Sequence, residues 1–235
     1  MPDRQTVKKG QFLEIKYTGY ANNEVFDSNI EEDLKAIDPE GKTEPQKTII
    51  VLGEGMLVPG LDAQLEGKEI GKEYSLDIKM KDAFGPRERS MIRTIPLKAF
   101  TEQKVHPHAG MVLTLDNSLV KIIAVSGARV TADFNNPLSG KDLKYKITIT
   151  RGVTDDKEKA ETLLVLFFRF TPEFELKEKK VIIKGPKIFE QMIEVYKDKF
   201  KELSGLELGF ELKENKPKED KGSEEKEEVE DDSSD

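Results

Sequence analysis

The stretch LVPGLDAQLEG at residues 57–67 decides how the N-terminal part of this sequence folds. Pro59 and Gly60 open a segment in which Leu61 and Leu65 lie four residues apart, so both side chains lie on one face of a helix. Gly67 stands where glycine commonly ends a helix, because glycine adopts the left-handed backbone conformation without strain. The stretch therefore predicts one short helix with a single apolar face.

The residues on either side of this helix predict strands. Leu13, Ile15 and Tyr17 alternate with polar residues, which is typical of a strand with one buried face. The remaining elements expected in this region are a polar loop at 29–47 and strands at 48–52, 74–80 and 143–149. We therefore predict a β-rich domain made of residues 1–87 and 132–151, whose closing strand comes late in the sequence.

Separate material interrupts this domain before its closing strand. Its apolar residues form short runs divided by turn residues, a pattern typical of antiparallel strands. These runs lie at residues 111–115, 119–125 and 129–134. We therefore predict an inserted all-β domain of residues 88–131 with a small core of its own.

A third unit is expected at residues 155–212, after the closing strand. Four apolar runs give it the element order β-β-α-β. The expected elements are strands at 162–170 and 181–183, a helix at 188–203 and a strand at 206–212. A unit of this size is marginal on its own. Since its first predicted strand is very apolar, we expect self-association, as a homodimer.

The net charge of −8 is unevenly distributed along the chain. Residues 214–235 contain eleven acidic and four basic residues, which leaves the body of the protein nearly neutral. The segment 213–235 has no aromatic residue and a single valine, so it is expected to be a disordered acidic tail. A nearly neutral body with an acidic tail argues against nucleic acid as a partner.

The composition excludes several kinds of chemistry. The sequence has no cysteine, so disulfides, thiolate metal sites and cysteine nucleophiles are excluded. The only two histidines, His106 and His108, flank Pro107 without a third ligand nearby, so neither a metal site, a cofactor nor a Ser-His-Asp triad is expected. No apolar stretch has the length of a secretory signal or a membrane helix, and we expect a cytoplasmic protein.

The remaining candidate site consists of apolar and aromatic residues at strand ends and turns. Four motifs follow one another: Tyr17-Thr18-Gly19, Val25-Phe26-Asp27-Ser28, Leu57-Val58-Pro59-Gly60-Leu61 and Asp82-Ala83-Phe84-Gly85. In this order the motifs resemble those of the FKBP family of peptidyl-prolyl isomerases. The resemblance covers residues 1–86 and 136–151. It implies an α+β fold in which an antiparallel sheet wraps around a short helix.

The place of the insert adds to this resemblance. It falls in the flap just after Ala83-Phe84-Gly85, as in the SlyD-type and long archaeal members, where the insert is a chaperone domain for unfolded segments. Arg93-Thr94-Ile95-Pro96 and Asn136-Pro137-Leu138-Ser139-Gly140 resemble its two junctions. The unit at 155–212 is similar in size and element order to the extra C-terminal domain of long archaeal members.

The resemblance also implies roles for individual residues. The residues expected to be catalytic are Tyr17, Phe26, Asp27 and Tyr145. Those expected to bind the substrate are Leu57, Val58, Leu61, Phe84 and Leu138. Those expected to form an exposed chaperone surface are Ile95, Leu97, Phe100, Met111 and Leu113.

Two of these positions depart from the family pattern. Phe84 stands where many members have tyrosine, and Leu61 stands where compact eukaryotic members have tryptophan. Both departures put tight macrolide binding in doubt more than catalysis.

The function expected from the resemblance is isomerisation of X-Pro bonds in folding proteins, combined with binding of unfolded chains. The expected partners are therefore unfolded or partly folded proteins that contain proline. Two alternatives remain open at this stage. One is a holdase chaperone without useful catalysis, and the other is a dimeric scaffold that binds proline-containing partners.

Overall fold

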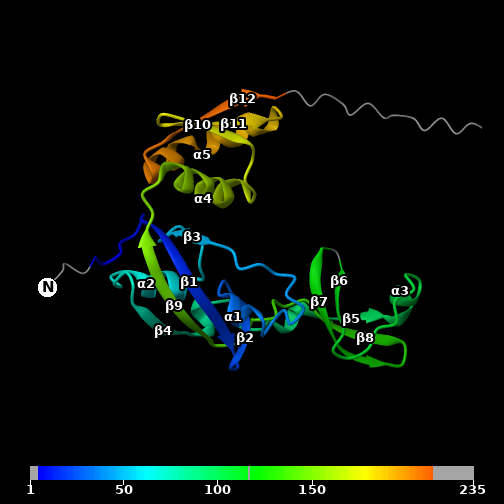
Figure 1. The fold of residues 1–235 in the computed structure, drawn as a ribbon. Helices are drawn as coiled ribbons and strands as arrows, with labels where there is room; N and C mark the ends of the chain where they lie inside the picture. Colours follow the sequence, from blue (N-terminus) through cyan, green and yellow to red (C-terminus); the bar gives the residue numbers. More distant parts are fainter. Residues whose placement is uncertain (1–4, 116, 214–235) are drawn as a thin grey trace, which may run out of the picture. The chain divides into compact units, whose positions relative to one another are not determined.

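The computed structural model describes residues 5–115 and 117–213 (Figure 1). It divides into two compact units, Met1–Phe170 and Thr171–Asp235. Apart from Lys213, the expected acidic tail lies outside the described residues. No helix within the described ranges is both long and apolar enough to cross a bilayer.

A five-stranded antiparallel sheet forms the centre of the first unit. Its strands are β1 (Phe12–Ala21), β2 (Glu24–Ser28), β3 (Thr48–Val51), β4 (Glu73–Ile78) and β9 (Leu143–Gly152). The strand order is β2-β1-β9-β4, and β3 also pairs with β1. The late strand β9 pairs with both β1 and β4, which confirms the prediction that the domain closes with a distant segment.

The predicted short helix is confirmed as α2 (Pro59–Leu65). Leu61 and Leu65 are almost fully buried and pack in the core that the sheet also lines. Gly60 allows this packing, because a Cβ atom there would lie 2.7 Å from the Cγ2 atom of Ile78 on β4. Gly67 has a φ of +78°, as expected for the residue that follows a helix.

The segment expected to be one long loop contains a short helix, α1 (Glu31–Leu34). Its Leu34 is buried, and α1 contacts β2. The prediction of an unstructured loop at 29–47 was therefore wrong for these four residues. One buried leucine among polar residues is too weak a periodic signal to predict a single helical turn.

The inserted region has its own antiparallel sheet with the order β5-β8-β7-β6. The strands are β5 (Ile92–Pro96), β6 (Val112–Leu115), β7 (Ser118–Ser126) and β8 (Arg129–Asp133). A helix, α3 (Leu97–Thr101), follows β5 and buries Phe100 against Val120, Ile122, Val130 and Ala132. The expectation of an all-β insert was therefore wrong, because this apolar segment covers the small core as a helix.

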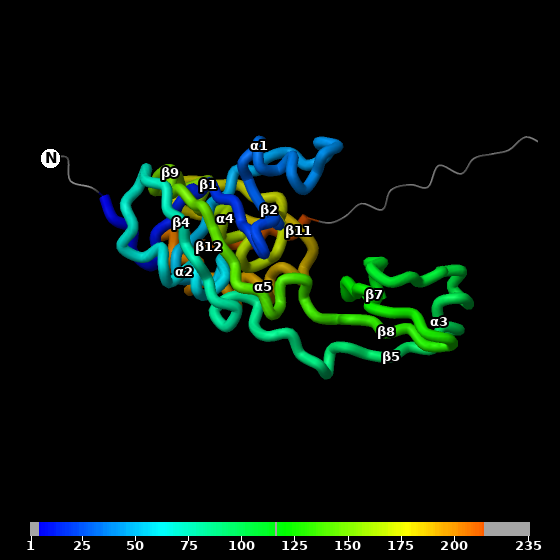
Figure 2. The backbone as a smooth tube through the Cα atoms, turned by 90° about the horizontal axis from the view of Figure 1, so that it is seen from below, coloured from blue at the N-terminus to red at the C-terminus, as the bar shows by residue number. Residues whose placement is uncertain are grey.

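Two segments, residues 85–88 and 133–140, form the neck between the central sheet and the insert, and they lie side by side (Figure 2). The Gly140 N–H donates to the Gly85 carbonyl at 2.8 Å. Arg87 donates to Asp133 from its Nε atom at 2.9 Å, and the Asn135 side chain bonds both backbone groups of Glu88. These contacts hold the two ends of the insert together next to the central sheet.

The apolar run at 162–170 is not the predicted strand but the second half of α4 (Asp156–Phe168). Asp155 caps this helix by accepting the N–H of Glu158 at 2.9 Å. Ala160, Leu164 and Phe168 lie four residues apart and are buried. The strand prediction was wrong because it started at Thr162 and ignored the capping residues before it.

The second unit contains the order β-β-α-β that the sequence predicted, with its first strand displaced. Its elements are β10 (Phe174–Lys177), β11 (Lys180–Gly185), α5 (Ile188–Ser204) and β12 (Glu207–Leu212). β10 and β11 are antiparallel, and β12 joins β11 in parallel after α5. Val181, Ile183 and Phe200 have no exposed surface and belong to the buried interior of this unit.

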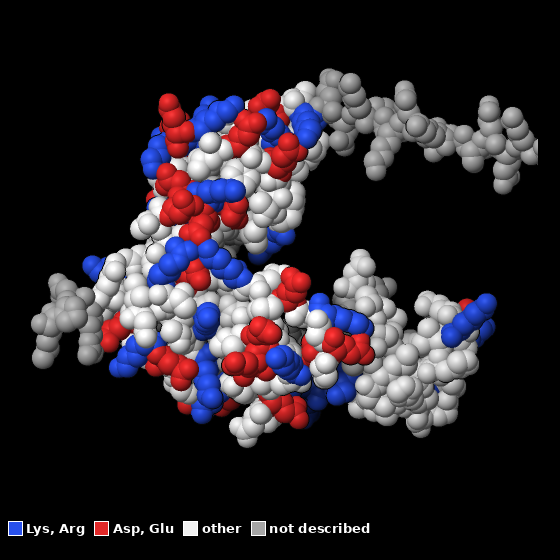
Figure 3. Space-filling model, viewed as in Figure 1, with Lys and Arg blue, Asp and Glu red and all other residues white. Residues whose placement is uncertain are grey.

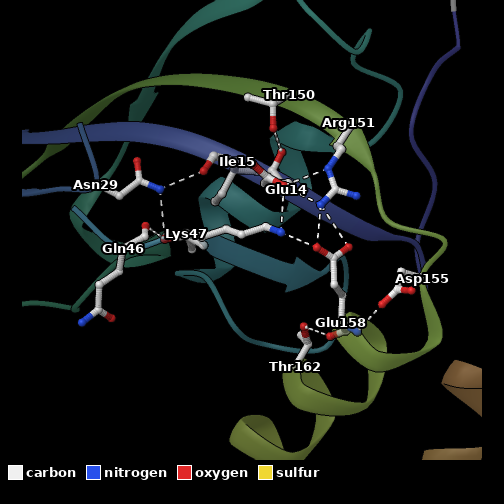
Figure 4. A network of polar contacts seen from close by, with 11 residues as sticks. Glu14, Ile15, Asn29, Gln46, Lys47, Thr150, Arg151, Asp155, Glu158 and Thr162 are labelled. Atoms are coloured by element: carbon white, nitrogen blue, oxygen red, sulfur yellow. Dashed lines mark hydrogen bonds and ion pairs between the residues drawn. The ribbon is translucent and has the colours of Figure 1, made fainter. Parts of the chain in front are cut away.

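Charged residues of both signs alternate over the face of the molecule seen in Figure 3. One cluster of them joins α4 to the central sheet (Figure 4). Arg151 on β9 makes two bonds of 2.8 and 2.9 Å to Glu158 and donates to Glu14 on β1 at 2.9 Å. Lys47 also bonds Glu158. The Arg151 and Lys47 side chains lower the pKa of Glu158 to about 2.

The pKa of Glu158 is lower in the folded protein than its ordinary value of 4.5. We therefore expect Glu158 to stabilise the fold above pH 4.5 and to lose this stabilisation as the pH falls towards 2. Glu158→Gln should lower the thermal midpoint by a few degrees at pH 7. It should also make the thermal midpoint fall less steeply as the pH is lowered. Glu161→Gln is the matched control, since Glu161 only approaches Lys157 at 3.9 Å. Thermal unfolding followed by circular dichroism across pH 2–7 measures this, and identical pH profiles for both variants would contradict it.

Candidate active site

Three aromatic side chains from separate segments meet at one end of the central sheet. Tyr17 comes from β1, Phe26 from β2 and Tyr145 from β9. The rings of Phe26 and Tyr145 are 5.8 Å apart edge to face, and those of Tyr17 and Tyr145 are 6.4 Å apart at 50°. Ring distances of this size are typical of stabilising aromatic pairs.

Gly19 allows the three rings to come this close. It lies on β1 opposite Asp27 and Tyr145, at an irregularity in the pairing with β2. A Cβ atom on Gly19 would lie 2.7 Å from the Cζ atom of Phe26 and 3.0 Å from the Cε1 atom of Tyr145. A side chain at this position would therefore force the rings apart.

The Tyr17 hydroxyl donates to the Asp27 carboxylate at 2.9 Å. Burial first, and then the bond to Asp27, raise the pKa of Tyr17 well above its ordinary value. Burial and the charge of Asp27 raise the pKa of Tyr145 to about 12. Both phenols therefore keep their protons at neutral pH and can act as hydrogen-bond donors.

Apolar side chains surround these rings. Leu61 on α2 is 1 % exposed and belongs to the same core cluster as Tyr145. The half-buried residues that pack against this cluster include Tyr17, Phe26, Met56, Leu57, Val58, Ala83 and Leu138. Val58 directly precedes α2, and no hydrogen bond from its N–H is found among the described residues. An N–H beside an apolar cluster can donate to the carbonyl group of a bound peptide.

The structure brings together eight of the nine residues that the sequence predicted for catalysis and substrate binding: Tyr17, Phe26, Asp27, Leu57, Val58, Leu61, Leu138 and Tyr145. Phe84 is not part of the cluster. It is 36 % exposed, and its carbonyl accepts a bond from the Ser139 hydroxyl at 3.2 Å.

The five residues predicted as an exposed chaperone surface lie on the inner face of the insert. Phe100 is 4 % exposed, so its expected exposure was wrong. The half-buried residues Ile95, Leu97, Met111 and Leu113 pack against the same small core. All five residues are apolar, and in a sheet with one covered face apolar side chains point towards that covered face.

The exposed apolar residues of the insert are others, which the sequence reading missed. They are Val112, Leu119, Ile123 and Val125, with exposures of 52 %, 53 %, 39 % and 38 %. The signal that could have found them is alternation, since Val112 and Leu119 neighbour the inward-facing Leu113 and Val120.

No group of three His, Cys, Asp or Glu side chains suited to a metal ion occurs in the described part of the chain. His108 is exposed, and its Nδ1 atom lies 3.2 Å from the carbonyl of Ala109. The residues available for chemistry at the aromatic cluster are therefore the phenols, one carboxylate and apolar side chains.

Comparisons with known proteins agree with this arrangement. The profile described as "FKBP-type peptidyl-prolyl cis-trans isomerase" matches residues 3–105, and the one described as "FKBP26, IF domain" matches residues 93–138. A short-type peptidyl-prolyl cis-trans isomerase of Methanocaldococcus jannaschii is 33 % identical over 61 % of this chain and 92 % of its own length.

SlyD proteins are also similar to this chain. SlyD of Treponema pallidum is 31 % identical over 51 % of this chain and 68 % of its own length. SlyD of Escherichia coli K12 is 28 % identical, and the match spans about half of that protein, 51 %.

The profile that matches residues 3–105 and the relative from Methanocaldococcus jannaschii place this fold in the class of enzymes that isomerise prolyl peptide bonds. The chain belongs to the FKBP-type peptidyl-prolyl cis/trans isomerase family, on the SlyD-like side of that family.

We expect Gly19→Ala to lower both stability and isomerase activity, because the added methyl group displaces the Phe26 and Tyr145 rings. Overpacking of this kind typically costs about 1–3 kcal/mol. Denaturant unfolding and a protease-coupled assay on a proline tetrapeptide measure the two effects. Gly152→Ala is the control, since a Cβ atom there meets nothing within 4 Å. Equal activities of the two variants would contradict the role of Gly19.

Proposed function

We propose that the aromatic cluster around Tyr17 and Asp27 is the isomerase site, and that the inserted sheet holds unfolded segments of the same substrate protein. The observation that carries the first part is the convergence of the Tyr17, Phe26 and Tyr145 rings with the Asp27 carboxylate. The observation that carries the second part is the exposed apolar face of the insert.

The proposed reaction makes and breaks no covalent bond, and its rate depends on the polarity of the surroundings of the prolyl amide. Rotation about a peptide bond is opposed by amide resonance, with a barrier of about 18–20 kcal/mol. The planar amide is the more polar state, and water stabilises it. Apolar walls formed by Phe26, Leu61 and Tyr145 disfavour that state and favour the twisted transition state. Catalysis then follows from tighter binding of the transition state than of the substrate.

The polar groups of the cluster orient the substrate in this proposal. The N–H of Val58 donates to a carbonyl of the bound chain. Tyr17 holds the Asp27 carboxylate at the edge of the cluster, where it faces the rotating amide. Leu57 and Leu138 complete the walls, and Phe84 adds an exposed apolar contact without the hydroxyl of a tyrosine.

Removal of the Asp27 carboxylate tests this assignment. We expect Asp27→Ala to lower kcat/KM on a proline tetrapeptide by about tenfold, which corresponds to roughly 1.4 kcal/mol of lost transition-state stabilisation. Asp77→Ala is the matched control, because it removes an exposed carboxylate from β4 that has no role in the proposed site. Isomerase activity of the intact protein would also distinguish an isomerase from a non-catalytic holdase. Full activity of Asp27→Ala would refute the role of this carboxylate.

The insert offers a groove for an extended chain. The groove has a volume of about 660 Å³, and its lining includes the exposed Val112, Leu119 and Ile123. Most residues of the segment 136–141 also line it, and Leu138 of that segment packs against the core cluster that includes Tyr145. In this proposal a chain held in the groove presents its prolines to the nearby site at high effective concentration.

Two substitutions test this second part. We expect Val112→Ser combined with Leu119→Ser to lower activity on an unfolded protein several-fold and to leave tetrapeptide activity unchanged. Removal of residues 88–131 should act in the same direction and more strongly. The control combines Ile188→Ser and Val195→Ser, which removes apolar side chains that are 59 % and 72 % exposed on α5. Equal losses on both substrates would overturn the proposal.

A further inference from the structure

Strand β1 lacks a strand partner along part of one edge, directly at Tyr17. β3 pairs with β1 from Phe12 to Ile15, and β2 pairs with it from Thr18 to Ala21. The backbone groups between these two ladders need partners from elsewhere, because an unpaired buried N–H or carbonyl group is costly.

The side chain of Asn29 fills this gap (Figure 4). Its Oδ1 atom accepts the Tyr17 N–H at 2.8 Å, and its Nδ2 atom donates to the Ile15 carbonyl at 2.8 Å. The two bonds reach the residues on either side of Lys16, as the N–H and C=O of one residue do in a parallel ladder. Nδ2 also donates to the Thr48 hydroxyl on β3 at 2.9 Å.

The carbonyl of Tyr17 is held by the same short segment. It accepts the Asn29 N–H at 3.2 Å and a bond from the Ser28 hydroxyl at 2.9 Å. Ser28 lies 3.0 Å from the fully buried Thr18 hydroxyl, which in turn bonds Asp33 on α1. Both backbone polar groups of Tyr17 therefore bond to the two residues that directly follow Asp27.

We propose that Asn29 is a positioning residue for the isomerase, which sets the backbone of Tyr17 so that its hydroxyl meets Asp27. The inference rests on the proposed role of the Tyr17–Asp27 pair. The amide of Asn29 lies at the sheet edge and acts only through Tyr17. A backbone shift of about 1 Å would stretch the 2.9 Å bond between Tyr17 and Asp27 beyond hydrogen-bond range.

A double-mutant cycle distinguishes this role from a purely structural one. We expect Asn29→Ala and Tyr17→Phe each to lower kcat/KM on a proline tetrapeptide about three- to tenfold. The double variant should be about as active as the less active of the two single variants. Multiplying losses of activity in the double variant would overturn the positioning role.

Two further variants keep the test decisive if Asn29→Ala unfolds. Asn29→Asp keeps an oxygen that accepts the Tyr17 N–H but places it against the Ile15 carbonyl, so we expect more activity than Asn29→Ala at no greater stability. Thr48→Val removes the third bond of Asn29 and leaves the two to β1, so we expect parental activity. Activities that simply follow the thermal midpoints of these variants would overturn the inference.

The cycle also separates this inference from the proposed function. If Tyr17→Phe and Asp27→Ala both retain full activity, the assigned isomerase site is wrong. If they lose activity and Asn29→Ala does not, the site stands and the role of Asn29 is wrong. Amide hydrogen exchange at Tyr17 provides the direct readout, since Asn29→Ala should accelerate it and Thr48→Val should not.

Discussion

The pairing of β1 with β9 is the constraint on which the rest of the first unit depends. It runs from Leu13 opposite Gly152 to Ala21 opposite Leu143, and it joins the beginning and the end of the unit. The same ladder places Tyr145 opposite Gly19, next to Tyr17 and Phe26. The aromatic cluster therefore depends on this long-range pairing. A pairing between such distant segments carries a large loop-closure cost, which local interactions must offset.

The neck of the insert reduces that cost. The backbone bond between Gly85 and Gly140 closes the central domain as if the insert were absent. Arg87 pairs with Asp133, a side chain that is 12 % exposed, and removal of Arg87 would leave this carboxylate poorly solvated. Because the ends of the insert meet here, its own core can vary without a change in the register of β1 and β9. This explains physically why one sheet can hold both a prolyl site and an additional domain.

Periodicity was enough to predict the strands of the central sheet and α2, since these depend on alternation or on local turn chemistry. The order of the motifs was enough to choose eight residues that lie together in the structure, whose roles in the reaction stay a prediction. The strand expected at 162–170 was wrong because the capping bond of Asp155 lies outside the apolar run. Phe100 was wrongly expected to be exposed and the exposed Val112 was missed, because apolarity alone does not say which face of a sheet is covered. Asn29 gave no signal, because its contacts join three segments whose proximity appears only in three dimensions.

In the proposed mechanism the two functions are linked by one short segment. Residues 136, 137 and 139–141 line the groove on the insert, and Leu138 from the same segment packs against the core cluster that includes Tyr145. A weak hold serves such an enzyme better than a tight one, because each proline must leave before the next can enter. The exposed Val112, Leu119 and Ile123 of the groove suit that requirement, since they offer apolar contact at the surface of the insert.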